Sequence, residues 1–419
     1  MGRQKNTIYV QIAAYRDPEL IPTIKDCIEQ AKYPGNLRFG IAWQHSPYDD
    51  FDDLSEFKND YRFRIIDIDY RDAKGVPYAR YLLNKKYGGE KYTLQLDSHH
   101  RFEKNWDVDL IKMIKDLERA GYEKPLLSSY VPSYEPTTYP EGSATEPWIM
   151  EFDRFAPEGP VHFLPHSINN FRELDLPVPT RFVGGHFIFT YGKYCKEVEY
   201  DPQYYFHGEE INLSIRSYMA GYDLFAPHKI CVYHEYQRDG KQRHWDDHGD
   251  WDARDKDSHA HHRRMFGMDG NPPEIENEDY PRTLRDYERY AGLEFSSRRV
   301  HPATLHRQPP PVSLTDEEHE EGLVSYQRVC IDLYKQSVPE EDYNVWVIAF
   351  EDVDGEEFHR DDAYPDEIAQ IIRESNEGNH FYQIWRNFYA DEHPVKWIVW
   401  PHSESKGWGE RLEGYFNVG

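Results

Sequence analysis

YTLQLDSH, residues 92–99, is the stretch of sequence that decides the fold. The mostly apolar run from Tyr92 to Leu96 predicts a buried strand, and polar side chains follow it at once. Side chains two residues apart on an extended chain point to the same side, so Asp97 and His99 can face one metal ion. A carboxylate with an imidazole suits Mn²⁺ or a similar divalent ion. D-x-H alone is a common chance pattern, and its place after an apolar strand is what makes it informative.

The segments around this strand predict further strands that alternate with helices. Apolar runs predict strands at 7–14, 37–44 and 63–70, and helical spacing of apolar residues predicts helices at 17–31, 76–88 and 107–120. At the first helix, Asp17 can cap and Pro18 suits the first turn. Such alternation favours an open, mostly parallel α/β sheet, in which ligands bind beyond the carboxyl ends of the strands. Asp97 stands at such an end.

Patterns farther along the chain are less regular. Residues 130–180 are rich in Pro, Gly and aromatic residues and predict irregular surface loops. We expect a strand at 182–190, a helix at 208–221 and a strand, turn and strand at 223–236. The almost wholly polar segment 236–270 predicts a long loop or lid that leads into a helix.

A Pro- and His-rich segment, HPATLHRQPPPVSLTDEE at 301–318, predicts a linker between two domains, 1–300 and 319–419. The second domain is expected to be small, β-rich and of the α+β class. Its patterns predict a hairpin at 343–360 around Asp354-Gly355, a helix at 365–374 and strands at 380–389 and 395–403.

Charge and composition restrict the partners. The formal net charge is −27, and the chain has no long Lys/Arg run, so a polyanionic nucleic acid is not expected to bind. The four cysteines are far apart in the sequence and predict free thiols. The N-terminal residues lead straight into a strand without a signal-type segment, and no stretch approaches ~18 apolar residues. We therefore expect a cytoplasmic protein without a membrane span.

Two more groups are candidates for a site. His234 ends an apolar strand and can be a third metal ligand, although a lone histidine is more often an ordinary hydrogen-bonded residue. Glu209 and Glu210 follow Gly208 at a predicted helix start, where the helix dipole alone favours acidic residues. The alternative is that one of the two carboxylates faces a substrate hydroxyl.

These elements, taken in order, resemble a known group. IYVQIAAYRDPELIPTIKDCIEQAKYP (8–34), the segment RDAKGVPYARYLLNKKYGGEKYTLQLDSHHRFEKNWD (71–107), the segment from VGGHFIFT to CVYHEY (183–236) and RTLRDYERYAGLEF (282–295) carry the resemblance. They are similar to GT-A-fold glycosyltransferases, and within these to the cytoplasmic UDP-GlcNAc:hydroxyproline polypeptide GlcNAc-transferases (the Skp1 type). Polypeptide GalNAc-transferases are a more distant match. The resemblance covers roughly residues 7–290 and implies a Rossmann-like GT-A catalytic domain.

The resemblance implies roles for individual residues. It implies that Asp97, His99 and His234 bind a divalent metal, Mn²⁺ or Mg²⁺. Glu209 matches the glutamate of a Gly-Glu-Asn element in the GalNAc enzymes, whereas Glu210 stands where those enzymes have Asn; both are candidate catalytic residues. The UDP-GlcNAc donor is expected to contact residues at strand ends and glycine turns: Arg16, Asp17, Arg80, Asp97, Gly184 and Gly185.

The polar segment supplies two more candidate donor contacts. His244 and Arg263 are expected to close over the diphosphate of the donor and exclude water, and a solvated loop is the alternative interpretation for these side chains. Ser98 has no assigned role, and His100 is expected to be a structural neighbour of the site rather than a ligand.

The resemblance also implies the reaction, a metal-dependent, retaining transfer of GlcNAc from UDP-GlcNAc to a hydroxyl of a polypeptide, with hydroxyproline as one such hydroxyl. A glycan acceptor, another UDP-sugar on a non-protein acceptor, and a catalytically weak binding scaffold are the alternatives. A nucleotidyltransferase is disfavoured because AAYRDPEL, after the first strand, has no glycine-rich loop. The C-terminal domain is expected to present the acceptor or to form a homo-oligomer contact.

Overall fold

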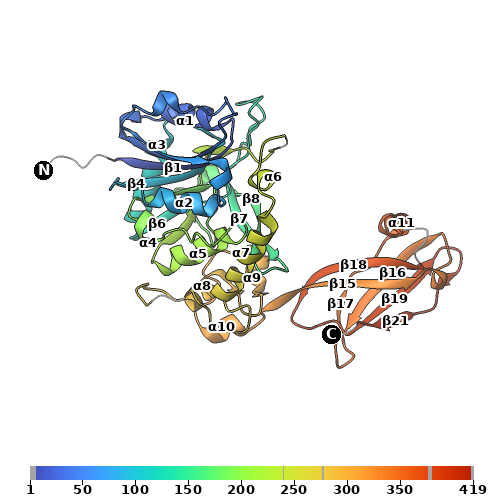
Figure 1. Ribbon diagram of the computed structural model, residues 1–419. Helices are drawn as coiled ribbons and strands as arrows, with labels where there is room; N and C mark the ends of the chain where they lie inside the picture. The colour runs from blue at the N-terminus through green and yellow to red at the C-terminus, as the bar shows by residue number, and fades with distance from the viewer. Residues whose placement is uncertain (1–5, 239, 276–277, 376–379, 417–419) are drawn as a thin grey trace. The chain divides into compact units, whose positions relative to one another are not determined.

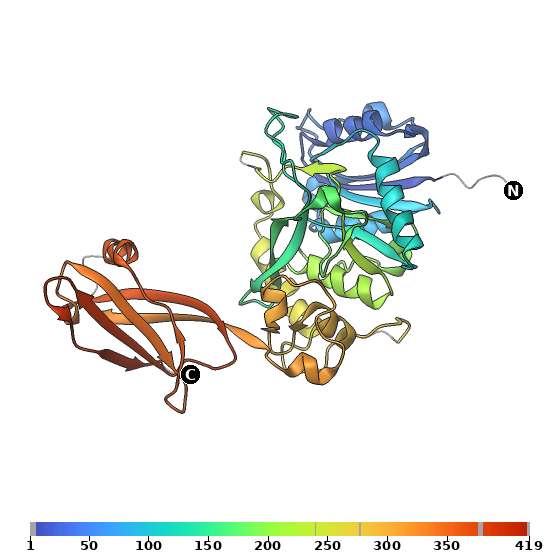
Figure 2. The ribbon, with the colours of Figure 1, turned by 180° about the vertical axis from the view of Figure 1, so that it is seen from behind.

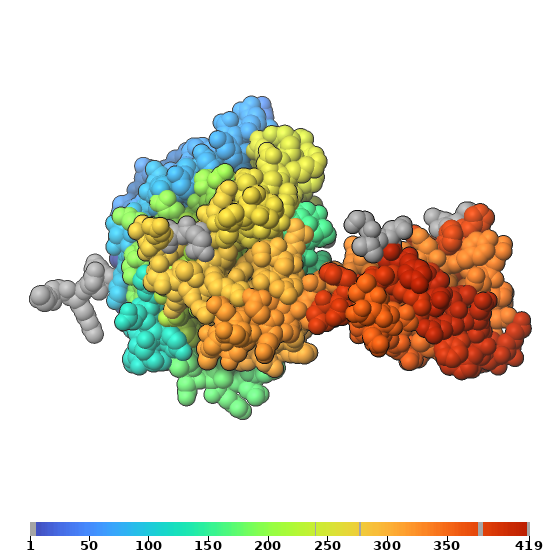
Figure 3. All heavy atoms as spheres, turned by 90° about the horizontal axis from the view of Figure 1, so that it is seen from below, coloured from blue at the N-terminus to red at the C-terminus, as the bar shows by residue number. Residues whose placement is uncertain are grey.

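The computed structural model describes residues 6–238, 240–275, 278–375 and 380–416. The chain divides into two compact units, one of Met1–Arg298 with Ala303–Asp316 and one of Arg299–Pro302 with Glu317–Gly419 (Figure 1). Residues 303–316, which were expected to be a linker, thus belong to the first unit. The segment from α6 to α10, yellow to orange in Figure 3, forms much of the face of that unit seen there.

The first unit is built on an eight-stranded sheet with the strand order β3-β2-β1-β4-β10-β6-β11-β9. β10 runs antiparallel to β4 and β6, and β9 runs antiparallel to β11, whereas the other neighbours are parallel. The predicted α/β class with a mostly parallel open sheet is confirmed. The strands are β1 (Ile8–Tyr15), β2 (Leu37–His45), β3 (Phe63–Asp69), β4 (Tyr92–Asp97), β6 (Pro125–Ser128), β9 (Val178–Pro179), β10 (Phe187–Tyr191) and β11 (Asp223–Ala226).

Helices cover both faces of this sheet. α1 (Leu20–Gln30) and α3 (Trp106–Arg119) bury their apolar stripes against one face, in a core that includes the even-numbered side chains of β1. α2 (Val76–Asn84) packs on the other face, where the small Ala13 and Ala42 allow it to come close. The other helices are α4 (Tyr194–Glu197), α5 (Glu209–Met219), α6 (His244–Asp247), α7 (Trp251–Met265), α8 (Leu284–Ala291), α9 (Pro302–Leu305) and α10 (Asp316–Glu320).

Two sequence expectations need correction. Within 130–180, predicted as irregular loops, β7 (Trp148–Phe155) and β8 (Val161–Ser167) form an antiparallel hairpin, visible in green in Figure 2. Its short apolar runs are masked by the Pro- and Gly-rich residues around them. The strand expected at 182–190 begins only at Phe187. The backbone N–H groups of Gly184 and Gly185 donate to side chains of other segments and not to the backbone of a neighbouring strand.

The second unit contains two sheets with a core between them. The strands β14 (Arg299–Val300), β15 (Val324–Tyr334) and β18 (Phe381–Ala390) belong to one sheet. The other contains β16 (Tyr343–Glu351), β17 (Glu357–Arg360), β19 (Lys396–Ser403), β20 (Gly407–Trp408) and β21 (Leu412–Tyr415), and α11 (Pro365–Glu374) buries Ile368 in the core. The expected β-rich character, the hairpin at 343–360 and the helix at 365–374 are confirmed.

Two further expectations, free thiols and no membrane-spanning helix, can be compared with the described part of the chain. All four cysteines are free thiols, three of them buried, as expected. None of the helices in the described ranges is long and apolar enough to span a bilayer.

Candidate active site

A cavity of about 500 Å³ lies beyond the carboxyl ends of the central strands. Tyr15 at the end of β1, Gln44 near the end of β2 and Asp97 at the end of β4 line it. Open parallel sheets bind ligands at this edge, and ~300–1,000 Å³ is the usual range for a small-molecule site. The start of α5 and residues of the polar segment before α6 complete the wall.

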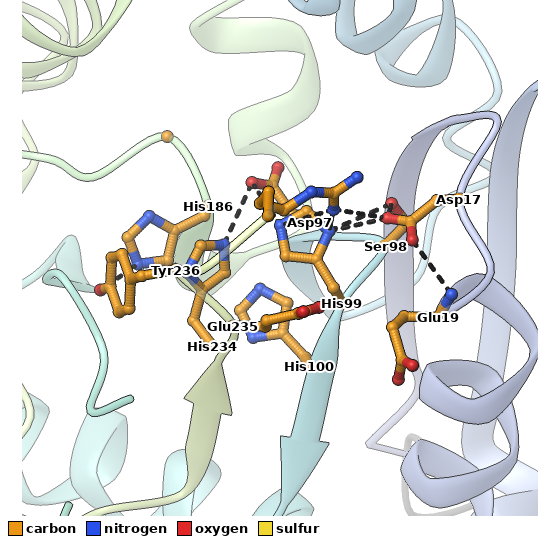
Figure 4. A network of polar contacts seen from close by, with 12 residues as sticks. Asp17, Glu19, Asp97, Ser98, His99, His100, His186, His234, Glu235 and Tyr236 are labelled. Atoms are coloured by element: carbon orange, nitrogen blue, oxygen red, sulfur yellow. Dashed lines mark hydrogen bonds and ion pairs between the residues drawn. The ribbon is translucent and has the colours of Figure 1, made fainter. Parts of the chain in front are cut away.

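Three potential metal ligands meet at one end of the cavity (Figure 4). Asp97 ends β4, His99 follows two residues later, and His234 ends β12 (Val232–His234), which pairs antiparallel with β5 (His100–Phe102). His234 Nε2 lies 3.4 Å and His99 Nε2 lies 3.8 Å from Asp97 Oδ2. One ligand atom from each residue falls within 4.8 Å of the others. The strand pairing thus brings together side chains that are 137 positions apart in the sequence.

Asp17 holds His99 in position from behind. Its carboxylate is 1% exposed, and Oδ2 lies 2.8 Å from His99 Nδ1. A proton on Nδ1 that points to Asp17 leaves the lone pair of Nε2 facing Asp97, which is the way a carboxylate orients a metal-binding histidine. Burial raises the pKa of Asp17, but His99 and Arg238 together bring it below its ordinary value, so Asp17 stays ionised. The structure thus gives Asp17 a positioning contact, and Asp17, an expected donor contact, also lines the cavity.

His234 is suited to bind a metal in its neutral form. Burial lowers its pKa to about 3, so the ring is not protonated at neutral pH. Its ring stacks on that of His186, with 4.2 Å between ring centroids, and lies 5.0 Å from that of His100. Burial also holds the pKa values of His100 and His186 well below the usual range. These neighbours therefore add no positive charge beside the three potential ligands.

Arg80 joins the potential metal site to the start of α5. It is 2% exposed, and its guanidinium donates to Asp97 Oδ1 and, at 3.0 Å, to Glu209 Oε1. Burial raises the pKa of Asp97, but Arg80 and the two histidines more than offset this, and the net pKa is well below its ordinary value. A Cβ on Gly185 would lie 2.8 Å from both Arg80 Nη1 and Glu209 Oε1, so this ion pair requires glycine there.

Glu209 and Glu210, the two candidate catalytic residues, have different surroundings. Glu210 accepts from the Gly185 backbone N–H at 2.8 Å and from the Tyr130 hydroxyl at 2.6 Å, so both of its oxygens are engaged. Glu209 uses Oε1 for Arg80, and its buried Oε2 has no hydrogen-bond partner among the described residues. Both line the cavity. Glu209 is therefore the carboxylate with an oxygen available to a ligand.

The titration of Glu209 leads to a stability prediction. Burial raises its pKa to about 7, with Arg80 opposing the shift and Glu210 adding to it. A folded-state pKa above the unfolded one gives stability at low pH that is lost as pH rises towards 7. Glu209→Gln removes this titration, so between pH 5.5 and 8 the variant should lose about 2 kcal/mol less unfolding free energy than the wild type does.

Urea unfolding at the two pH values measures this difference. Glu90→Gln is the matched control, because the side chain of Glu90 is also buried but its pKa is lowered by hydrogen bonds to Arg64 and the backbone against the effect of burial. Its titration lies below this pH window, so this variant should keep the wild-type slope. Equal slopes for all three proteins would mean that Glu209 is ionised in the folded protein throughout the window.

Three expected donor contacts do not line the cavity. Arg16 pairs with Asp49 at 2.7 Å and Asp247 at 2.9 Å, so its charge is already matched within the protein. Arg263 lies on α7 and donates to the Glu158 carbonyl at 2.9 Å. A Cβ on Gly184 would lie 2.8 Å from the Ser129 carbonyl oxygen, so that glycine permits backbone packing. His244 does line the cavity, where its Nδ1 lies 2.7 Å from the Tyr205 hydroxyl.

Sequence reasoning missed Arg238, His186 and Tyr236. Arg238 Nη1 donates to Asp17 Oδ2 at 2.8 Å and also contacts the ring of His99. Tyr236 donates to the Val131 carbonyl at 2.8 Å beside His186. The sequence held one indication of two of these residues. His186 directly follows the two glycines, and Arg238 comes shortly after His234, so both are close in sequence to candidate site residues. All three line the cavity.

The family model described as Glycosyltransferase (GlcNAc) matches residues 7–60 and 47–296. No curated protein matches the chain. Among solved structures, the chain is similar to GalNAc-T7 with UDP, GalNAc and Mn²⁺, at 15% identity and a TM-score of 0.44, over 68% of this chain and 48% of that one. It thus spans about half the length of GalNAc-T7.

A second similar structure is S. aureus TarS 1–349 in complex with UDP-GlcNAc, at 12% identity and a TM-score of 0.36, over 57% of this chain and 60% of that one. The family match extends over most of the first unit, from β1 to β13 (Leu293–Glu294), and includes every residue of the cavity described above. The chain belongs to the Glycosyltransferase (GlcNAc) family.

Proposed function

We propose that this enzyme transfers GlcNAc from UDP-GlcNAc to a hydroxyl of a polypeptide, with Asp97, His99 and His234 holding a divalent metal ion such as Mn²⁺. The observation that carries the proposal is the meeting of these three side chains at the carboxyl end of β4, in a chain of this family. The finer family assignment, to the hydroxyproline-modifying enzymes of the cytoplasm, is part of the same proposal.

The donor atoms fit a divalent ion. One carboxylate oxygen and two neutral imidazole nitrogens suit Mn²⁺, and Asp17 fixes the tautomer of His99 that such binding needs. Asp97 is ionised and His234 is neutral, so neither has to lose a proton first. A divalent ion held there would act as a Lewis acid that stabilises charge on the leaving diphosphate, an effect worth several kcal/mol.

The chain's own residues would supply the rest of the donor site. Arg238, which contacts the ring of His99, and His244 both line the cavity and can face the diphosphate of a donor. Glu209, with its free oxygen, is placed to hold a hydroxyl of the sugar or of the acceptor. For a retaining transfer, we expect same-face substitution in which a leaving phosphate oxygen takes the acceptor proton.

The cavity supports an acceptor with ring-shaped or extended groups. Phe163, Phe206 and Trp245 line it, and Phe206 packs edge-on against Trp245 with 5.8 Å between ring centroids. Aromatic faces pack well on proline-type and sugar rings. A polypeptide hydroxyl is therefore the acceptor that we propose, with a glycan as the alternative.

UDP release tests the donor and the metal together. With UDP-GlcNAc and excess Mn²⁺ we expect slow UDP release by hydrolysis even without an acceptor. Chelation should remove it, and restored Mn²⁺ should recover it. A parallel screen of UDP-GalNAc and UDP-glucose tests the choice of sugar. UDP release that is unchanged by chelation would contradict the metal, and no release from any UDP-sugar, with or without hydroxyproline peptides, would make the chain a binding scaffold.

A further inference from the structure

In the second unit, the outer face of the sheet that contains β15 and β18 is rich in aromatic side chains. β15 and β18 pair antiparallel over ten rows, from Ser325 opposite Ala390 to Tyr334 opposite Phe381. Alternate side chains point inward, where Ile331, Leu333 and Ile384 join the core. The others point outward and form what we call the aromatic face, defined by Tyr326, Tyr334, Phe381, Trp385 and Tyr389.

The rings of the aromatic face lie in three rows along the strands. Tyr326 lies opposite Tyr389 with 5.3 Å between ring centroids, and Tyr334 lies opposite Phe381 with 5.6 Å between them. Trp385 lies midway, opposite Cys330. At ~3.4 Å per residue, neighbouring rows are about 13 Å apart. The face therefore offers three aromatic positions in a line.

Three of these rings are exposed although exposure is unfavourable for them. The exposed fraction is 49% for Trp385 and 40% for both Tyr334 and Phe381. The Arg328 guanidinium stands 4.9 Å from the Trp385 ring centroid and steadies the indole while half of the side chain stays open. Exposed rings that gather on one face of a sheet are typical of a binding surface.

Between the aromatic rows stand planar hydrogen-bonding groups. Arg328 lies opposite Asn387, and Asp332 lies opposite Gln383, whose side-chain N–H donates to Asp332 at 3.3 Å. The outward positions from 326 to 334 and from 381 to 389 hold no aliphatic side chain. One cation and one anion balance each other, in a chain whose net charge is −27.

This alternation matches one class of ligand. A neutral glycan presents apolar C–H faces, which stack on aromatic rings, and hydroxyls, which bond to amides, carboxylates and guanidinium groups. A nucleic acid or an anionic membrane surface would need a basic patch, and a contact between two copies of the chain is an outcome that light scattering tests below. The three rows reach farther than one sugar ring, so the ligand that fits is a chain of sugars.

We propose that the aromatic face of β15 and β18 binds a neutral glycan chain, with Trp385 as its central contact. This binding is a function of the second unit, separate from the donor site and beyond the transfer proposed above. The outer face of the other sheet differs: Lys396 pairs there with Glu351 and Glu413, and Trp400 packs against Trp408 with 4.4 Å between ring centroids.

Affinity electrophoresis of the full chain tests the proposal. Native gels contain hydroxyethyl cellulose, glycol chitin or galactomannan as neutral probes, and polygalacturonate as an anionic one. We expect retardation in at least one neutral gel. Trp385→Ala should raise the apparent dissociation constant at least about ten-fold, because it removes the central stacking surface. Trp408→Ala is the matched control, since Trp408 is equally exposed at 50% but lies on the other sheet, and it should bind like the wild type.

Three results would overturn the proposal: no retardation in any neutral gel, retardation only in polygalacturonate, or equal retardation of Trp385→Ala and wild type. Light scattering provides a fourth, because a wild-type dimer that Trp385→Ala converts to monomers would make the face a contact between two copies. Thermal unfolding confirms that the variants are folded. UDP release without acceptor should be unchanged in Trp385→Ala, so a failure of glycan binding is distinguishable from a failure of the donor site.

Discussion

His99→Ala is expected to remove metal-dependent UDP release, by a factor of at least about a hundred, while the protein stays folded. The variant loses one of the three proposed ligands, and the several kcal/mol that a bound ion would contribute correspond to a hundredfold or more in rate. The fold should survive because Asp17, the buried carboxylate behind His99, keeps its bonds to Arg238 and Ser98. It is therefore not left as an uncompensated charge.

A graded variant and a matched control sharpen this test. Asp17→Asn keeps all three ligands but weakens the hold on the His99 tautomer, and should lose roughly 10–100-fold in metal affinity or activity. His228→Ala removes another buried imidazole, 3% exposed, that does not line the cavity, and it should keep wild-type activity. Isothermal titration with Mn²⁺ separates lost metal binding from lost turnover. Full activity of His99→Ala in metal-depleted buffer supplemented with Mn²⁺ would refute the metal role.

The sequence predicted local features of this site better than contacts between distant segments. The two-residue period of an extended chain put Asp97 and His99 on one side, and the strand before them was visible as an apolar run. His234 was a candidate because it ends an apolar segment, yet its approach to Asp97 depends on the pairing of β12 with β5, whose register no local pattern determines. The resemblance to known enzymes, rather than periodicity, suggested that the three meet.

The differences between expectation and structure have the same physical origin. Arg263 and Arg238 are both cations in one polar segment, and only the fold shows that Arg263 caps the Glu158 carbonyl while Arg238 reaches Asp17. Arg16 was assigned to the donor because of its place after β1, but two aspartates from distant segments neutralise it. The hairpin of β7 and β8 was missed because proline and glycine around its short strands are the usual signals of loops.

Arg80→Leu is expected to destabilise the protein by about 3–5 kcal/mol at pH 8, the usual cost of removing one partner of a buried ion pair. Arg80 is the shared cation between Asp97 and Glu209, and its loss leaves two buried carboxylates without that charge. Arg80→Lys is the matched control, because it keeps the charge and loses only the two-pronged geometry. It should cost clearly less in urea unfolding.

The pH dependence distinguishes a lost charge from lost packing. Burial already raises the pKa of Glu209 to about 7, and Arg80 acts to lower it. Without Arg80 the pKa should rise further, so Glu209 keeps its proton to higher pH in the folded variant than in the wild type. A raised folded-state pKa gives stability that is lost as pH rises. The destabilisation by Arg80→Leu should therefore be smaller at pH 6 than at pH 8.

A double variant tests the same charge from the other side. Glu209→Gln in the Arg80→Leu background removes one of the two carboxylates that Arg80→Leu leaves unpaired. At pH 8 the double variant should be more stable than Arg80→Leu alone, with a coupling energy in the range of ~0.5–3 kcal/mol. Mn²⁺ should raise its stability further, because an ion bound only by the folded state would offset the charge of Asp97. If Arg80→Leu costs the same at pH 6 and pH 8, and Glu209→Gln gives no relief, then the guanidinium stabilises the fold by packing and not by its charge.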